Sequence, residues 1–246
     1  MSRLGLVAAF LLPTFASAQS TLTSRTIDEN VMVRLPYGPC QIPNLVLRIA
    51  QVLRVPAGAE GVPERCPGPD HPLPPATGFQ SLRGMTGREA LDALVQLDPR
   101  YRWVESDGVI VVRPIEAWEN RDHFLHRSAS SFTFANENIN HAVAALKSAL
   151  GPLQIPSVDV LGASPLAERR FSVSLGATSA YEALNAIVRS HGELAWIVGY
   201  CQPPVSYEHS LLSLVTFDGS GTGWRGAYAR RSDGTVYNPC GEAIGK

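Results

Sequence analysis

The sequence predicts an α+β protein made of two tandem units, each of the order βαβ–βαββ, with two helices packed on small mixed sheets. Two observations predict this class. The segment EALDALV at residues 89–95 returns as EALNAIV at residues 182–188, and Trp103 returns as Trp196 at the same spacing. Each copy is preceded by one predicted strand and followed by two more. A repeat that preserves the helix, the tryptophan and the strands favours duplication over a chance match.

Composition excludes several classes of protein. The chain has 246 residues, of which 45% are hydrophobic and 17% charged, and this balance is the opposite of that found in disordered chains. The formal net charge is −1, so the chain lacks the basic surface that a nucleic-acid partner would require. We therefore expect a folded protein with no nucleic-acid partner.

The first residues are typical of a secretory signal peptide, which we assign to residues 1–18. Arg3 precedes an apolar stretch over residues 4–15, and Ala16-Ser17-Ala18 provides a small-x-small cleavage site. We expect export to the periplasm or the medium. The remaining chain has no uninterrupted apolar run of about 20 residues, so we expect no membrane span in it.

Four cysteines follow the signal peptide, and an exported protein with an even number of them favours disulfides. Cys40, Cys66, Cys201 and Cys240 allow three pairings. We favour Cys40–Cys66 and Cys201–Cys240, because each pair then lies within one half of the chain. Zinc is the alternative, but no closely spaced cysteine or histidine knuckle occurs. We expect no metal and no cofactor.

The first unit is assigned to residues 19–115. Its predicted order begins with a strand at residues 31–35, a helix at 44–53 and a strand at 78–83. Residues 56–77 are rich in proline and glycine, and we interpret them as an irregular insertion.

The second helix of this unit begins at a capping box, Thr86-x-x-Glu89, in which hydroxyl and carboxylate each bind the other residue's backbone amide. A strand at residues 101–105 follows. A tight turn at residues 106–108 then leads into a return strand at 109–112, which Pro114 ends.

Residues 116–127 are interpreted as a polar link to the second unit, residues 128–217. The predicted elements of that unit are strands at 131–134 and 170–175, helices at 138–150 and after the capping box Ser179-x-x-Glu182, and strands at 194–200 and 211–217. The loop at 201–210 takes the place of the tight turn in the first unit.

The final segment, residues 218–246, is a glycine-rich tail with a possible hairpin at Asp233-Gly234. Its few apolar groups and many glycines make ordering costly unless something ties it down. We expect the tail to fold on the second unit, held by the pairing of Cys201 with Cys240.

The strand-to-helix junctions and closing strands resemble the short N-terminal domain of secretins and TonB-dependent receptors. The residues that carry the resemblance are 82–94, 101–112, 175–187 and 194–198. The resemblance implies a periplasmic domain that contacts other proteins, either inner-membrane machinery or an anti-sigma regulator. This sequence departs from the family because residues 218–246 are too few for even the smallest outer-membrane barrel. We therefore expect a soluble pair of such units.

Three motifs invite a chemical interpretation. Residues 221–226, GTGWRG, match the dinucleotide fingerprint by letter, but no helix and second strand can follow, so we interpret them as a loop. His123-x-x-His126 could present two metal ligands, although surface histidines fit the spacing better. Two pairs of neighbouring arginines could form an anion-binding patch, or they could simply be part of a solvated face. They are Arg169, Arg170, Arg230 and Arg231.

These observations favour an exported, non-enzymatic module that binds a protein partner in the cell envelope, at an exposed sheet edge. Trp103 and Trp196 are expected in the core, since both occupy one structural position. The alternative is a secreted enzyme of unknown class whose site is built by loops 56–77 and 201–210 and the tail. A pocket that places His71 or His209 beside acidic residues would favour the enzyme.

Overall fold

A computed structural model describes residues 22–36, 41–63, 75–151, 157–161, 165–200, 210–218, 229–230, 236–237 and 243–245. The predicted α+β class is confirmed, with helices and strands of both pairing directions in the same molecule. The predicted signal peptide, all four cysteines, the motif at 221–226, His71 and His209 lie outside the described residues.

The first half of the chain contains the expected strands and helices together with one strand, β2, that was not expected. Its elements are β1 (Met32–Leu35), α1 (Gln41–Leu53), β2 (Ala57–Glu60), β3 (Gly78–Ser81), α2 (Gly87–Leu97), β4 (Tyr101–Ser106) and β5 (Val109–Pro114). The link that follows is structured rather than simply polar. It holds α3 (Ile115–Glu119) and the 3₁₀ turn η2 (Phe124–His126), where Phe124 and Leu125 are buried.

The second half repeats the same order. Its main elements are β7 (Phe132–Glu137), α4 (Ile139–Leu150), β8 (Ser157–Leu161), β9 (Phe171–Leu175), α5 (Ala180–His191), β11 (Leu194–Tyr200) and β12 (Ser210–Thr216). Short pieces accompany them: η1 (Leu22–Ser24), η3 (Pro165–Glu168), and the paired strands β6 (Ser128–Ala129) and β10 (Thr178–Ser179).

The two halves pair their strands in the same way. In each half the first and third strands form a two-stranded antiparallel sheet, β1–β3 and β7–β9. The remaining three form the orders β4-β5-β2 and β11-β12-β8, each an antiparallel hairpin with a parallel third strand.

The halves do not keep separate sheets. Strand β2 of the first half pairs in parallel with β11 of the second, which gives one six-stranded sheet of order β4-β5-β2-β11-β12-β8. This joint corrects the expectation of independent small sheets. The reason is that β2 and β11 are buried at every residue, so each would leave an apolar edge in water if the halves separated.

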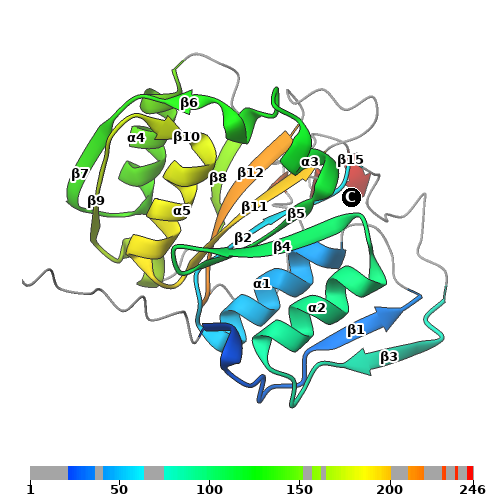
Figure 1. Cartoon of the computed structure of the whole chain (residues 1–246). Helices are drawn as coiled ribbons and strands as arrows, with labels where there is room; N and C mark the ends of the chain where they lie inside the picture. Colours follow the sequence, from blue (N-terminus) through cyan, green and yellow to red (C-terminus); the bar gives the residue numbers. More distant parts are fainter. Residues whose placement is uncertain are drawn as a thin grey trace, which may run out of the picture.

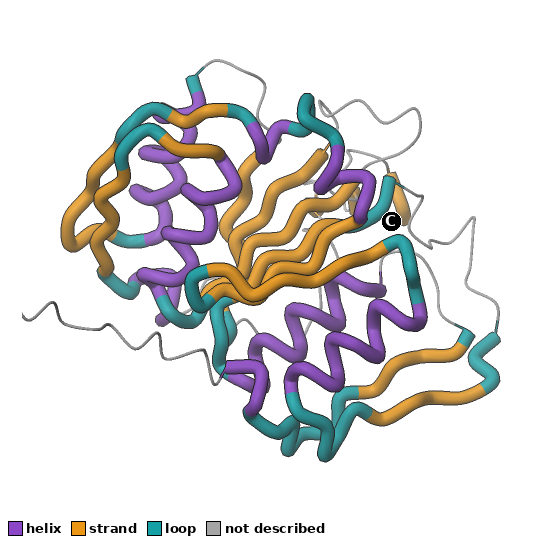
Figure 2. Tube along the Cα trace, viewed as in Figure 1, coloured by secondary structure: helices purple, strands orange, loops and turns teal. Residues whose placement is uncertain are grey.

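The shared sheet carries helices on both faces (Figures 1 and 2). Helices α1 and α2 cover one face, and β1–β3 lies beyond them. Helices α4 and α5 cover the other face, and β7–β9 lies beyond those. One apolar core fills each side, and neighbouring residues of β11 point into different cores, with Ala195 and Ile197 on one side and Trp196 and Val198 on the other.

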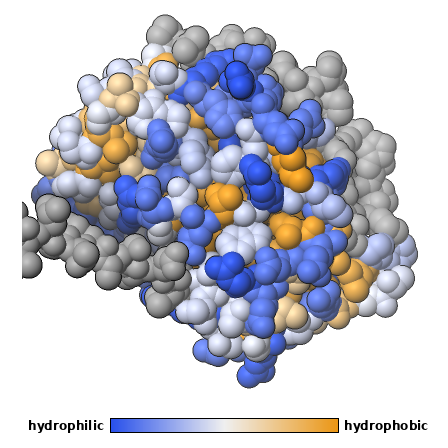
Figure 3. Space-filling model, viewed as in Figure 1, coloured by the Kyte–Doolittle hydropathy of each residue, from blue (hydrophilic) through white to orange (hydrophobic). Residues whose placement is uncertain are grey.

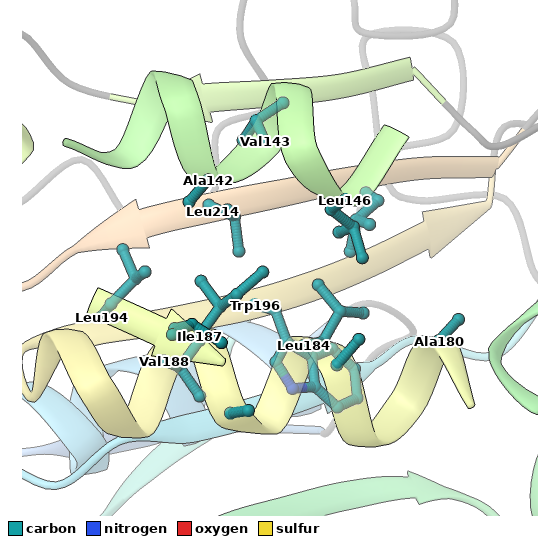
Figure 4. Close-up of a cluster of buried hydrophobic side chains, with 14 of the residues drawn as sticks. Ala142, Val143, Leu146, Ala180, Leu184, Ile187, Val188, Leu194, Trp196 and Leu214 are labelled. Atoms are coloured by element: carbon teal, nitrogen blue, oxygen red, sulfur yellow. The ribbon is translucent and has the colours of Figure 1, made fainter. Parts of the chain in front are cut away.

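The core on the side of α4 and α5 is centred on the tryptophan of the second copy. Figure 4 shows Trp196 among Leu184 and Ile187 of α5 and Leu146 of α4. Trp196 is fully buried and donates its Nε1–H to Asn185 Oδ1 at 2.9 Å. The expectation that this tryptophan belongs to the core is therefore confirmed.

Strand β2 is a correction to the sequence analysis, because it lies within the range 56–77 that was interpreted as irregular. Its residues are Ala57, Gly58, Ala59 and Glu60, and all four are buried. Alanine and glycine have low strand propensity, and a strand buried on both faces shows no alternation of apolar and polar residues. These residues therefore form a strand because they pair with β5 on one side and β11 on the other.

The described part of the tail contains three short strands, β13 (Ala229–Arg230), β14 (Val236–Tyr237) and β15 (Ala243–Gly245). They pair with one another antiparallel, and the turn predicted at residues 233–234 lies outside the described residues. The predicted tie through Cys240 lies outside the described residues.

Candidate functional site

Four polar side chains meet inside the molecule, where the two halves and the link converge. Glu60 ends β2, Arg113 lies near the end of β5, His123 precedes η2, and Tyr200 ends β11. Glu60 and Arg113 have no exposed side-chain surface, His123 has 1%, and Tyr200 as a residue has 8%. We call these four residues the joint cluster.

The hydrogen bonds of the joint cluster centre on the Glu60 carboxylate. Arg113 Nε donates to Glu60 Oε2 at 2.6 Å, and His123 Nε2 lies 2.6 Å from Glu60 Oε1. The Tyr200 hydroxyl donates to the same Oε1 and lies 2.9 Å from His123 Nε2. The Leu125 amide donates to His123 Nδ1 at 3.1 Å, so the network assigns the ring proton to Nε2.

The position of Arg113 follows from strand alternation. Val109 and Val111 face the core of α4 and α5, and Arg113 is two residues further on the same face. Its guanidinium lies over the ring of Trp118 at 4.7 Å and near that of Tyr181 at 5.8 Å. Its Nη2 donates to the Ala117 carbonyl at 3.0 Å. Its buried Nη1 has no hydrogen-bond partner among the described residues.

The charges of the joint cluster balance. Burial would raise the pKa of the Glu60 carboxyl, but the hydrogen bond from His123, the charge of Arg113 and the hydrogen bond from Tyr200 together hold its pKa below the usual value. Glu60 and Arg113 are therefore held as a buried ion pair. For the nearby His126, burial lowers the pKa of the imidazole. Its Nε2 lies 3.3 Å from the Ala117 carbonyl oxygen.

A pocket of about 150 Å³ opens beside the joint cluster. Its wall is formed by Glu60, Gly61, Pro63, Pro114, Glu116, Ala117, Asn120, His123 and Tyr200. Pockets for drug-sized ligands are roughly 300–1,000 Å³, a range that this pocket does not reach but the adjoining hollow of about 360 Å³ does. A neighbouring hollow shares Pro63, Pro114 and Glu116, and adds Val62, Arg100 and Ile115.

The joint cluster holds several elements together. His123 uses both ring nitrogens inside the protein, and each oxygen of Glu60 accepts a hydrogen bond. The network therefore joins β2, β5, β11 and the link to one another.

The interpretation of His123 and His126 as surface histidines is wrong for His123, which is buried, and His126 is half-buried. The polar sequence of the link concealed this, because the apolar Phe124 and Leu125 carry His123 inward. Within the described ranges no three histidine, cysteine or acidic side chains are grouped so that they could hold a metal ion.

Sequence reasoning missed Glu60, Arg113 and Tyr200. A signal for Arg113 was present: a charge follows four apolar residues in a strand, in phase with Val109 and Val111. A charge at a core-facing position requires a buried partner. Nothing in the sequence names Glu60 as that partner, because the two are brought together only by the parallel pairing of β2 with β5.

The predicted anion patch is described only for Arg169 and Arg170. Arg169 donates to the His191 carbonyl at 3.0 Å and pairs with Glu193 at 3.3 Å. Arg170 donates to the Asn136 carbonyl at 2.8 Å. The side chain of Arg230 and all of Arg231 lie outside the described residues.

A second candidate surface is the two-stranded sheet β1–β3. Met32 is 40% exposed and Phe79 is 60% exposed on its outer face, while Val33 between them in register is buried. When the registers of β1–β3 and β7–β9 are superposed, Thr133 corresponds to Met32 and Ser172 corresponds to Phe79. On the face drawn in Figure 3, hydrophobic residues form small separate groups among hydrophilic ones.

None of the family models matches the chain, and no curated protein and no solved structure matches it. Among the described residues, no helix has the length and apolar character needed to cross a bilayer.

Proposed function

We propose that the protein is an exported, non-enzymatic module that binds a protein partner in the cell envelope, in the manner of the short N-terminal domains of secretins and TonB-dependent receptors. The observation that carries this proposal is the exposed apolar pair Met32 and Phe79 on β1–β3. Exposed aromatic and methionine side chains are enriched where proteins meet.

The comparison of the two halves makes this pair informative. Both halves build the same two-stranded sheet, and the second half keeps its outer face polar, where Thr133 and Ser174 lie 3.2 Å apart through their hydroxyls. The fold therefore does not need apolar residues at this position. Met32 and Phe79 lie on the same face of β1–β3, so together they offer a partner apolar surface that the second half lacks.

The two-stranded sheet also suggests how a partner could be bound. A sheet of two strands has two outer edges, and extended segments bind such edges through main-chain hydrogen bonds. Phe79 would then supply an apolar anchor beside the added strand.

Replacing both apolar residues by those of the second half tests the proposal. The variant Met32→Thr/Phe79→Ser places on β1–β3 the residues that the same fold already carries on β7–β9, so we expect it to fold. In crosslinking from intact cells, a partner recovered with the natural chain should be lost with this variant. The control Ser174→Ala alters the corresponding face of the other half and should retain the partner. The proposal is contradicted if the partner is recovered in equal amounts with Met32→Thr/Phe79→Ser and with Ser174→Ala.

Export is tested separately. The signal-peptide assignment predicts that the protein isolated from its native cell begins at Gln19, because cleavage follows Ala18. Intact mass spectrometry would contradict this if residues 1–18 were still present. Peptide mapping without reduction would show in the same sample whether Cys40–Cys66 and Cys201–Cys240 form.

A further inference from the structure

The joint between the halves shows how this fold accepts an added strand. Strand β11 receives β2 in parallel, with Ala195 opposite Ala57, Trp196 opposite Gly58 and Val198 opposite Glu60. The indole of Trp196 lies across β2 so closely that a Cβ at residue 58 would be 2.0 Å from Trp196 Cε2. Glycine opposite the tryptophan is therefore a steric condition for this pairing.

Strand β4 is the counterpart of β11 in the first half. Trp103 donates its Nε1–H to Asp92 Oδ1 at 2.8 Å, as Trp196 does to Asn185 at 2.9 Å. Trp103 is opposite Val112 in its hairpin, and Trp196 is opposite Leu214 in the other. The difference lies at the outer edge: β11 has β2 beside it, whereas β4 is an end strand of the six-stranded sheet.

Three side chains of β4 indicate that its outer edge can bind an added strand. Trp103 is half-buried, while its counterpart is fully buried under the added strand. Glu105 has a buried Oε1 that no hydrogen-bond donor among the described residues reaches. Arg102 is exposed, and its guanidinium lies over the Trp118 ring at 5.2 Å. At the same positions β11 has Ala195 and Val198, so the charges belong to this edge alone.

We propose that the outer edge of β4 binds an extended peptide segment of the form acid–Gly–x–base, parallel to β4. The register of the internal joint places the acid opposite Arg102, glycine opposite Trp103 and the base opposite Glu105. Directly opposed residues in a parallel pair lie on the same face, so both charge pairs can form. The base would supply the donor that Glu105 Oε1 lacks.

The occupant is a peptide of another protein rather than a second copy of this chain. A second copy could present either end strand of its sheet: β4, which has no glycine to place opposite Trp103, or β8, the counterpart of β2. Leu214 and Val112 are counterparts, because each lies opposite the tryptophan of its hairpin. In β8 the residue opposite Leu214 is Val160, and in β2 the residue opposite Val112 is Ala59. The preceding residue, Asp159, is therefore the counterpart of Gly58. A side chain at that position meets the tryptophan in the internal joint, and β8 therefore does not satisfy the steric condition.

A synthetic peptide, Thr-Val-Asp-Gly-Val-Lys-Val-Thr with blocked ends, tests the proposal. NMR of the whole chain should show saturable shifts of the Trp103 indole Nε1–H signal, assigned by loss in Trp103→Phe. Changing the peptide glycine to valine should weaken binding about tenfold or more, because the added carbons overlap the indole. Changing its lysine to glutamate should weaken binding about fivefold, and Glu105→Lys should restore the affinity for that peptide.

Controls separate this site from the β1–β3 surface. Met32→Thr/Phe79→Ser should leave the peptide affinity unchanged, since β1–β3 lies across the helices from the shared sheet (Figure 1). The proposal is overturned if the shifts do not saturate, or if the valine peptide binds as well as the glycine peptide. It is also overturned if the natural chain self-associates in sedimentation and Glu105→Lys abolishes this, which would assign the edge to a second copy.

Discussion

Glu60 and Arg113 form the most deeply buried ion pair of the described residues, and their energetic role follows from that burial. Removing one charge of such a pair leaves the other without compensation in a low-dielectric core. We expect Glu60→Gln to lower the free energy of unfolding by about 3–5 kcal/mol in chemical denaturation. The exposed pair Arg48–Glu29 provides the control, and Glu29→Gln should cost about 1 kcal/mol or less.

The pH dependence of stability should report the same carboxyl. The pKa of Glu60 is lower in the folded protein than its ordinary value of 4.5, so its stabilising contribution is complete above pH 4.5. The contribution is lost as the pH falls through the lowered pKa of the folded state. Urea unfolding between neutral and acid pH should therefore show a steeper acid decline for the natural chain than for Glu60→Gln. Parallel declines would contradict the assignment.

At this scale the sequence reveals residue types but not their partners. His123 was interpreted as a surface residue because its neighbours in the chain are polar, and its burial depends instead on how η2 packs against α5. The capping residues were predictable, because the partners of Thr86 and Ser179 lie three residues away. Local contacts can be inferred from sequence, whereas the contact of Glu60 with Arg113 cannot.

Helices α2 and α5 begin at capping boxes, as predicted, and both reciprocal hydrogen bonds are present in each. The Thr86 hydroxyl accepts from the Glu89 amide at 3.2 Å, and the Ser179 hydroxyl accepts from the Glu182 amide at 3.1 Å. The hydrogen bonds from Thr86 lower the pKa of Glu89. Those from Thr178 and Ser179 lower the pKa of Glu182.

Removing either cap should cost a similar free energy, because the two boxes have the same geometry. We expect Thr86→Ala and Ser179→Ala each to lower stability by about 1 kcal/mol, measured by thermal unfolding. Thr133→Ala, which removes a surface hydroxyl from a strand, is the matched control and should change stability less. A cost confined to one of the two helices would contradict the equivalence of the boxes.

The helices were predictable from periodicity and caps, and the first hairpin from the alternation in residues 101–105 and the turn that follows it. Strand β2 was not, since its four residues lack both alternation and strand propensity. The second half was no guide to β2, because its counterpart β8 was not predicted either.

The shared sheet makes the two halves one cooperative structure, and Gly58 is the residue on which the joint depends most directly. We expect Gly58→Val to destabilise the whole chain, because its side chain would overlap the Trp196 ring. Hydrogen exchange should then show faster exchange in β2 and β11 together. Gly61→Ala is the control: its Cβ would meet no described atom closer than 3.6 Å, so protection should be retained.

The parallel pairing of β2 with β11 also sets the order in which the chain can fold. These strands are neighbours in space but are separated by α2, the first hairpin, the link and most of the second half. Contacts of such long sequence separation form late, since the intervening loop must first close. During synthesis the first half therefore waits with the β2 edge uncovered until β11 has emerged. A chain truncated before β11 should therefore aggregate, and the natural chain should need that edge protected until β11 has been made.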